Sequence, residues 1–286
     1  MRRLALIATV AALAFVASGC DLRFLNPPAT APLRYRDQVF TNVTKTADLT
    51  YGSAQNIAGE TVTLKMDEYA PTGDAVTSRP AIVWVHGGSF SGGDKTSPEL
   101  VDESNTFAKK GFVNFSINYR LEPGGCSASS PTANCVKAIL EATADGQTAV
   151  KFLRTHASTY KLDPSRIAIA GTSAGAIVAL DVGFGSGEDA ASAVRAAVSL
   201  SGAQVVSAAT DAGDAPSLLF HGTSDTIVPY EWAVSTCRNA REAGLTCYLT
   251  SFEGDGHVPY VQHRTEILDQ TQNFHYSELG LKTAAR

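Results

Sequence analysis

Three residue types in this chain could together make a hydroxyl group into a nucleophile. Ser173 is the centre of the pattern Gly171-Thr-Ser-Ala-Gly175, which follows the apolar run Ile167–Ala170 and precedes a stretch suited to a helix. On a turn from strand to helix, the two glycines permit a tight backbone that exposes the serine hydroxyl. That hydroxyl attacks a carbonyl only when a base removes its proton and a carboxylate orients the base. Ser173 therefore predicts a histidine and an acidic partner elsewhere in the chain.

Asp225 and His257 are the expected partners, because each follows a predicted buried strand and the order along the chain is Ser, Asp, His. Asp225 comes after the strand at 217–220, and His257 lies on a glycine-containing loop after the strand at 247–252. Asp255 is an alternative carboxylate, although its separation of two residues disfavours contact with His257. Of the other histidines, we expect His86 and His221 to orient loops, and His156, His263 and His275 to be solvated on helices.

An acyl-transfer site also needs hydrogen-bond donors for the negative charge that develops on the tetrahedral intermediate. The backbone N–H of Ala174, directly after the nucleophile, is one expected donor. The segment His86-Gly-Gly-Ser-Phe90 follows the predicted strand at 81–85, and its glycines let backbone N–H groups approach a substrate. Gly87 and Gly88 are therefore the expected second part of an oxyanion hole.

The elements that must position these residues are buried strands that alternate with helices. Continuous apolar runs predict strands buried on both faces, and apolar residues at helical spacing predict the helices between them. The predicted strands are 81–85, 112–119, 167–170, 196–200, 217–220 and 247–252, and the predicted helices are 137–156, 231–243 and 261–274. This alternation predicts an α/β fold with a doubly wound, mostly parallel sheet. Alternating apolar and polar residues at 35–50 and 61–69 predict antiparallel N-terminal strands. The candidate residues all follow strand carboxyl ends, where such sheets hold their active sites.

With these motifs the chain resembles the α/β-hydrolase superfamily over most of residues 60–275. It is most similar to bacterial serine carboxylesterases of the feruloyl-esterase-like and hormone-sensitive-lipase-like kinds. The motifs that carry the resemblance are His-Gly-Gly-x-Phe at 86–90, Asn118-Tyr-Arg-Leu121, Asp163-Pro-Ser-Arg-Ile167 and Gly171-Thr-Ser-Ala-Gly175. The resemblance implies the same triad, with Ser173 as nucleophile, His257 as base and Asp225 as its orienting carboxylate. Ser89, Thr172 and Ala176 depart from the hormone-sensitive-lipase-like pattern, so no branch is assigned.

These features predict a serine carboxylesterase that forms an acyl-enzyme on Ser173 and uses no metal or organic cofactor. The segment between the strands at 196–200 and 217–220 is short and has room for at most a small lid. A small lid favours short acyl groups or bulky alcohols, so the expected partner is a small-molecule or polymeric ester. Two alternatives remain: a peptidase of the same fold, and a surface-anchored binding protein with an inactive site.

Composition and charge exclude other classes of function. The 286 residues are 44% apolar, enough for one large core. A net charge of -5 and the lack of long basic runs argue against nucleic acid as a partner. No cluster of His and Cys has the spacing of a metal site, so no metal is expected.

Residues 1–20 have the features of a signal peptide. Met1-Arg-Arg3 is positively charged, and Leu4–Ala17 is an apolar stretch of secretory length. The following Ala17-Ser-Gly-Cys20 resembles the bacterial lipobox, which implies lipidation of Cys20. An ordinary secretory signal, cleaved near the same small residues, is the alternative.

The rest of the chain is expected to be a tether at 21–33 and a catalytic domain at 34–286. Either kind of signal predicts export to the bacterial cell envelope. The protein would then be anchored to a membrane only through its N-terminal lipid, or be secreted or periplasmic.

Export bears on the four remaining cysteines, because disulfides form in oxidising compartments. They are Cys126, Cys135, Cys237 and Cys247. Three connectivities can join them, and the local pairs Cys126–Cys135 and Cys237–Cys247 are favoured. Each short loop would contribute on the order of 2–3 kcal/mol. Free buried thiols are the alternative.

Overall fold

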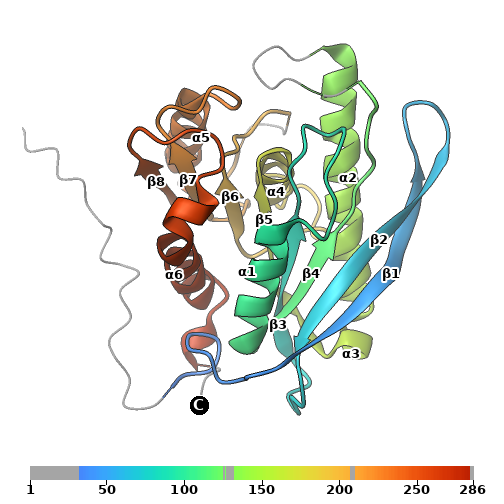
Figure 1. Ribbon diagram of the computed structural model, residues 1–286, viewed down its shortest axis with the longest axis vertical. Helices are drawn as coiled ribbons and strands as arrows, with labels where there is room; N and C mark the ends of the chain where they lie inside the picture. The colour runs from blue at the N-terminus through green and yellow to red at the C-terminus, as the bar shows by residue number, and fades with distance from the viewer. Residues whose placement is uncertain (1–31, 125, 127–131, 207–209, 284–286) are drawn as a thin grey trace, which may run out of the picture.

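The apolar runs that predict buried strands all join one eight-stranded sheet in the computed structural model (Figure 1). The model describes residues 32–124, 126, 132–206 and 210–283. The predicted signal peptide, with Cys20, and nearly all of the predicted tether lie outside these residues.

The sheet has the order β1-β2-β4-β3-β5-β6-β7-β8. Its strands are β1 (Val43–Gln55), β2 (Thr61–Pro71), β3 (Arg79–Val85), β4 (Val113–Ile117), β5 (Leu162–Thr172), β6 (Ala197–Leu200), β7 (Ser217–Gly222) and β8 (Cys247–Phe252). Strand β2 pairs antiparallel with both β1 and β4, and every pair from β4 to β8 is parallel. The predicted parallel sheet with antiparallel N-terminal strands is therefore confirmed.

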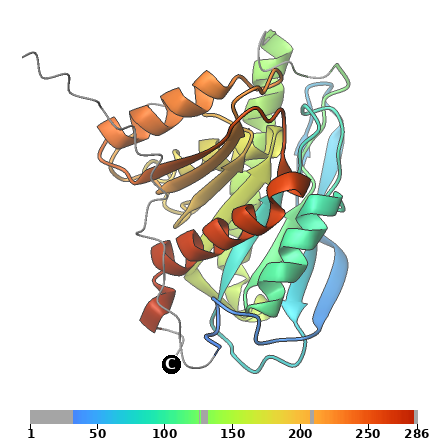
Figure 2. The same ribbon diagram turned by 60° about the vertical axis from the view of Figure 1, so that its left-hand side comes forward.

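Helices cover both faces of this sheet (Figures 1 and 2). They are α1 (Pro98–Lys109), α2 (Ala133–Thr155), α3 (Ala157–Tyr160), α4 (Ala174–Gly183), α5 (Tyr230–Glu242) and α6 (Tyr260–Glu278), followed by a short 3-10 turn at Leu281–Thr283. Alternate residues of β3 pack against the helices on opposite faces of the sheet. Ile82 and Trp84 share a buried cluster with α1 and α6, whereas Val83 and Val85 pack with α2 and α4. This two-sided burial explains why the central strands are continuously apolar.

The first predicted strand, at 35–50, is wrong in its first half, because β1 begins only at Val43. Tyr35 instead has a positive φ of 66° in a turn, and its N–H donates to the carbonyl of Lys110. The ring of Tyr35 is buried edge-on against Phe112. The buried contacts of Tyr35 thus favour a turn at a position where the alternating sequence pattern predicts a strand.

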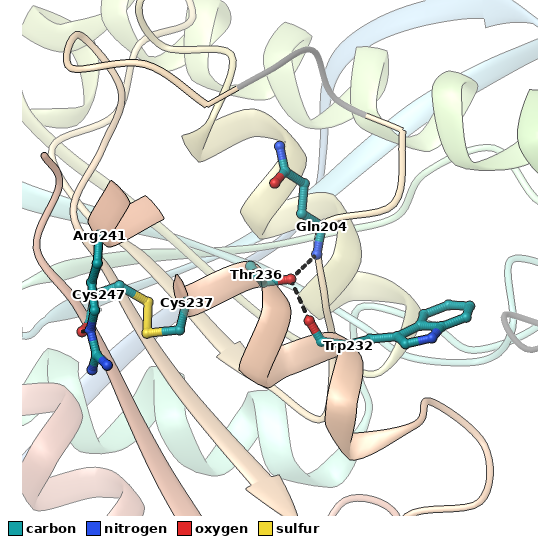
Figure 3. The surroundings of a disulfide bond; sticks show 6 residues. All are labelled: Gln204, Trp232, Thr236, Cys237, Arg241 and Cys247. Atoms are coloured by element: carbon teal, nitrogen blue, oxygen red, sulfur yellow. Dashed lines mark hydrogen bonds between the residues drawn. A yellow bond between two sulfur atoms is a disulfide. The ribbon is translucent and has the colours of Figure 1, made fainter. Parts of the chain in front are cut away.

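Both predicted local disulfides are present in the described residues. Cys126 pairs with Cys135, with Cα atoms 4.7 Å apart, and Cys237 pairs with Cys247, with Cα atoms 5.4 Å apart. The second bond joins α5 to the first residue of β8 (Figure 3). Disulfides are compatible with an exported protein. Among the described helices, none is long and apolar enough to span a membrane.

The chain between β6 and β7 contains no helix in its described parts, 201–206 and 210–216. It is held to α5 through Thr236, whose hydroxyl accepts from the Gln204 N–H at 3.0 Å and donates to the Trp232 carbonyl at 2.7 Å (Figure 3). No helical lid therefore covers the sheet from these described parts.

Candidate active site

Ser173 lies between the last residue of β5 and the first residue of α4. Its backbone has φ 54° and ψ -116°, a conformation that L-residues rarely adopt. The neighbouring glycines make this bend feasible. A Cβ on Gly171 would collide with the carbonyl of Gly175, and a Cβ on Gly175 would collide with the carbonyl of Val85. The Gly-x-Ser-x-Gly pattern thus has a steric origin, and it leaves the serine at the strand-to-helix turn that the sequence predicts.

The structure brings Ser173, His257 and Asp225 into one hydrogen-bonded chain. His257 Nε2 lies 2.7 Å from Ser173 Oγ, and His257 Nδ1 lies 2.7 Å from Asp225 Oδ2. These three residues come from the ends of β5, β7 and β8. With the imidazole proton on Nδ1, that N–H donates a hydrogen bond to the carboxylate, and Nε2 is free to accept the serine proton. The arrangement can therefore activate a hydroxyl nucleophile.

The hydrogen bonds around Asp225 favour the ionised form of its carboxyl group. Burial alone would raise the pKa of its carboxyl group, but hydrogen bonds from His221, His257 and the Ile227 N–H outweigh burial and hold the pKa well below its usual range. Its Oδ1 accepts from the backbone N–H groups of Ile227 at 2.8 Å and Val228 at 3.1 Å. A carboxylate that accepts this many hydrogen bonds is fixed in place as well as charged.

The alternative carboxylate, Asp255, contacts a different histidine. Its Oδ2 lies 2.5 Å from Nε2 of His263, which also stacks on Phe252 with ring centroids 3.9 Å apart. His263 is therefore held against the β8 end rather than freely solvated on α6. The prediction that His275 is solvated is also wrong, because its side chain is fully buried. Burial lowers the pKa of His275 to about 3.

The predicted oxyanion donors are Ala174, the neighbour of the serine in the chain, and two glycines that line the same pocket as the serine. Ala174 is the first residue of α4, where helix N–H groups have no partner within the helix. Gly87 lies so close to the nucleophile that a Cβ there would be 3.2 Å from Ser173 Cβ and 3.1 Å from the Thr172 carbonyl. Gly88 has φ +119°, which favours glycine, and a Cβ there would collide with the Gly92 carbonyl. The loop after β3 can therefore bring its backbone close to a reacting carbonyl.

A pocket of about 790 Å³ opens beside the serine and extends between α1 and α6. Ser173, His257, Gly87 and Gly88 line it at the sheet. Pro98, Ile227, Val258 and Val261 form apolar parts of its wall, and Glu99, Asp102, Tyr260 and Arg264 form polar parts. Within the polar group Asp102 accepts hydrogen bonds from Tyr260 at 2.7 Å and from Arg264 at 2.5 and 2.8 Å. The pocket has the size of a small-molecule site.

Comparison with known proteins finds similar sequences and a similar fold. The BD-FAE family model matches residues 66–197, and the Phospholipase/Carboxylesterase family model matches residues 135–274. The chain has the α/β-hydrolase fold. The structure of Est2 from Thermogutta terrifontis with propionate bound is similar to this chain, with a TM-score of 0.66 and 23% identity over 79% of this chain and 92% of that one. At this identity the likeness shows the fold.

Two curated relatives match shorter parts of this chain. Phenmedipham hydrolase from Pseudarthrobacter oxydans is 35% identical over 100 residues, which are 35% of this chain and 19% of the relative. Para-nitrobenzyl esterase from Bacillus subtilis (strain 168) is 33% identical over 96 residues, which are 34% of this chain and 19% of the relative. The chain therefore spans only a small share of the relatives' length.

The Asn118-Tyr-Arg-Leu121 motif anchors the loop after β3. Asn118 donates from Nδ2 to Asp94 and accepts at Oδ1 from the Lys95 N–H, at 3.0 and 2.6 Å. Tyr119 stacks on His86 and donates to its carbonyl at 3.2 Å. These contacts fix the loop on both sides of the glycines, which gives the motif a physical role.

Sequence reasoning missed a second anchor of this loop. The ammonium of Lys95 lies 2.8 Å from Asp67 Oδ1 and 3.2 Å from Asp48 Oδ1, and the Lys95 side chain is nearly buried. These three residues are far apart in the sequence and belong to no motif, so only the folded sheet could reveal the cluster. In the described residues, no group of three His, Cys, Asp or Glu could hold a metal ion.

Proposed function

We propose that this protein is a serine carboxylesterase that hydrolyses short-chain or bulky-alcohol esters through an acyl-enzyme on Ser173. The observation that carries the proposal is the continuous pair of 2.7 Å contacts from Ser173 through His257 to Asp225. The matching carboxylesterase family model and the names of the curated relatives support the same activity.

The proposed cycle has two halves that use the same residues. Ser173 Oγ attacks the ester carbonyl carbon while His257 Nε2 takes its proton. Backbone N–H groups of Gly87, Gly88 and Ala174 stabilise the oxyanion. The intermediate collapses as His257 returns the proton to the departing alcohol, which leaves the acyl group on Ser173. A water molecule, deprotonated by His257, then attacks the acyl-enzyme, and the released Ser173 oxygen recovers the proton.

The wall of the pocket supports a preference for short groups. Apolar side chains, with Ile227 50% and Val261 85% exposed, can cover a small alkyl or aromatic group. The part of the wall formed by α1 and α6 also contains the ion pair between Asp102 and Arg264. A long alkyl chain against this pair would remove water from two charged groups without replacing their hydrogen bonds, which is unfavourable.

The test is steady-state hydrolysis of p-nitrophenyl acetate, butyrate and decanoate, beside a p-nitroanilide of butyric acid. We expect kcat/KM for the butyrate ester to exceed that for the decanoate by about tenfold or more, because the longer chain must desolvate polar wall residues. The anilide should be hydrolysed far more slowly than the ester. Preference for the anilide would favour the peptidase alternative. Absence of turnover with every compound would favour the binding-protein alternative.

We further propose that the protein is exported and that Cys20 carries a lipid, with 21–33 as the tether and 34–286 as the catalytic domain. The positive and apolar segments before Cys20 support this proposal. Metabolic labelling with an alkyne fatty acid should mark the native protein in its bacterial host, and Cys20→Ser should abolish the label. A native protein that is exported without label would leave the secretory signal as the correct interpretation.

A further inference from the structure

A second histidine contacts the carboxylate of Asp225. His221 lies in β7, four residues before Asp225, and its side chain is fully buried. Its Nε2 is 2.8 Å from the carbonyl oxygen of Val228 and 3.1 Å from Asp225 Oδ2. The same carboxylate oxygen is 2.7 Å from His257 Nδ1. Asp225 Oδ2 therefore lies between two imidazole rings.

The contacts of His221 define which ring nitrogen carries its proton. A backbone carbonyl only accepts hydrogen bonds, so the 2.8 Å contact with Val228 requires a proton on Nε2 of His221. That N–H is shared between the carbonyl and the carboxylate. Nδ1 of His221 is buried and has no hydrogen-bond partner among the described residues. All of the polar contacts described for this ring are thus made through one nitrogen, and all are made to the Asp225 loop.

Two contacts attach the Asp225 loop to β7: the Asp225 N–H donates to the Gly222 carbonyl at 3.2 Å, and the side chain of His221 bonds to the loop. The loop closes on itself, because Asp225 Oδ1 accepts from the N–H groups of Ile227 and Val228. His221 ties both ends of this closed loop, the carboxylate and the Val228 carbonyl, to the strand. Tyr230, at the start of α5, packs edge-on against the ring with centroids 5.9 Å apart. The ring therefore has little freedom to leave this position.

We propose that His221 is a positioning residue of the active site: its Nε2–H holds Asp225 Oδ2 in the place from which the carboxylate orients His257. The proposal rests on the proposed esterase activity. His221 does not line the pocket that contains Ser173, so it has no contact with substrate in this role. If His221 only filled space in the core, activity would not depend on a hydrogen-bond donor at the position of Nε2. If it positions Asp225, activity requires that donor, and substitutions can separate the two roles.

The experiment compares His221→Gln with His221→Asn. The amide nitrogen of glutamine can reach the position of Nε2, whereas the shorter asparagine amide ends near Nδ1 and cannot bridge Val228 and Asp225. We expect His221→Asn to lower kcat for p-nitrophenyl butyrate by about 10- to 100-fold, the size of effect seen when a catalytic group is misplaced by about 1 Å. KM should change by less than about threefold, because no substrate contact is lost. His221→Gln should recover most of kcat.

His275→Asn is the matched control. His275 is also fully buried, and neither ring nitrogen has a hydrogen-bond partner among the described residues, but it lies against Phe107 and Phe274 rather than in the pocket lining. Urea unfolding of each variant gives the folded fraction, to which kcat is normalised. We expect His275→Asn to retain kcat per folded molecule.

Three results would overturn the proposal: unchanged kcat in His221→Asn, equal losses in the Asn and Gln variants, or a loss that appears in KM alone. Failure of the esterase proposal looks different, since the wild-type protein would then hydrolyse none of the esters. The two failures are therefore separated by the wild-type rate measured in the same assay.

Discussion

Ser173→Ala is expected to reduce kcat/KM for p-nitrophenyl butyrate by at least about 10⁴-fold. The substitution removes the Oγ that lies 2.7 Å from His257 and leaves the oxyanion donors in place. Whatever rate remains would come from water that attacks a substrate held by those donors. The folded structure should be little affected, because alanine and serine meet the same constraint at the positive φ of this position. Initial rates at several substrate concentrations provide the measurement.

Ser158→Ala is the control for this substitution, since Ser158 is an exposed serine on α3. Its kcat/KM should equal that of the wild-type protein. Comparable activity in Ser173→Ala and the wild-type protein would mean that the acyl-enzyme does not form on Ser173.

Asp225→Asn is expected to lower kcat by roughly 10³- to 10⁴-fold. The carboxylate accepts a hydrogen bond from Nδ1–H of His257, and an asparagine that donates from its own amide would favour the opposite tautomer, in which Nε2 cannot take the serine proton. Because hydrogen bonds hold the pKa of Asp225 well below its usual range, they favour the ionised carboxylate in the wild-type protein across the pH range of the assays. The loss in Asp225→Asn should therefore persist from acidic to alkaline assays.

Asp255→Asn is the matched comparison, since Asp255 is also an aspartate in contact with a histidine. Its partner is His263, and the side chains of the pair are about one third exposed, so its loss should cost little stability. We expect kcat within about threefold of the wild-type value, because Asp255 does not contact His257. A large loss of kcat in Asp255→Asn, with activity spared in Asp225→Asn, would transfer the orienting role to Asp255.

The sequence alone predicted the sheet and predicted that Ser173, Asp225 and His257 lie close together. Strands buried on both faces must be apolar along their length, and that pattern is visible without a structure. The positions of Ser173, Asp225 and His257 follow from parallel strands, whose carboxyl ends meet at one edge. Both local disulfides could be favoured for the simple reason that their cysteines are close in the chain.

Helix α1 was not predicted, because its buried face is not apolar throughout. Glu103 and Ser104 are buried in it between Leu100 and Phe107, which interrupts the expected stripe. Burial, with the nearby charges of Glu99 and Asp102, raises the pKa of Glu103 well above its usual range. In the sequence, a glutamate that is buried in this way cannot be told from a surface residue. Only its tertiary surroundings reveal otherwise.

The polar contacts around the site escaped prediction for a related reason. His263 reaches Asp255 across the end of β8, and Lys95 reaches Asp67 across the sheet, with no local motif to mark either pair. The place of His221 beside a glycine at a strand end predicted that it orients a loop, but did not show that it contacts the carboxylate of Asp225. Such contacts depend on side-chain directions that are set by packing, so periodicity and spacing do not encode them.

The measurement that tests the central claim most directly is the location of a covalent fluorophosphonate adduct. The purified protein is treated with the probe, digested and examined by tandem mass spectrometry, beside Ser173→Ala. We predict one adduct per molecule, on Ser173, formed in the wild-type protein and absent from the variant, because only a serine activated by His257 attacks phosphorus rapidly. Failure of the folded wild-type protein to react, or an adduct on another residue, would contradict the assignment of Ser173 as the nucleophile.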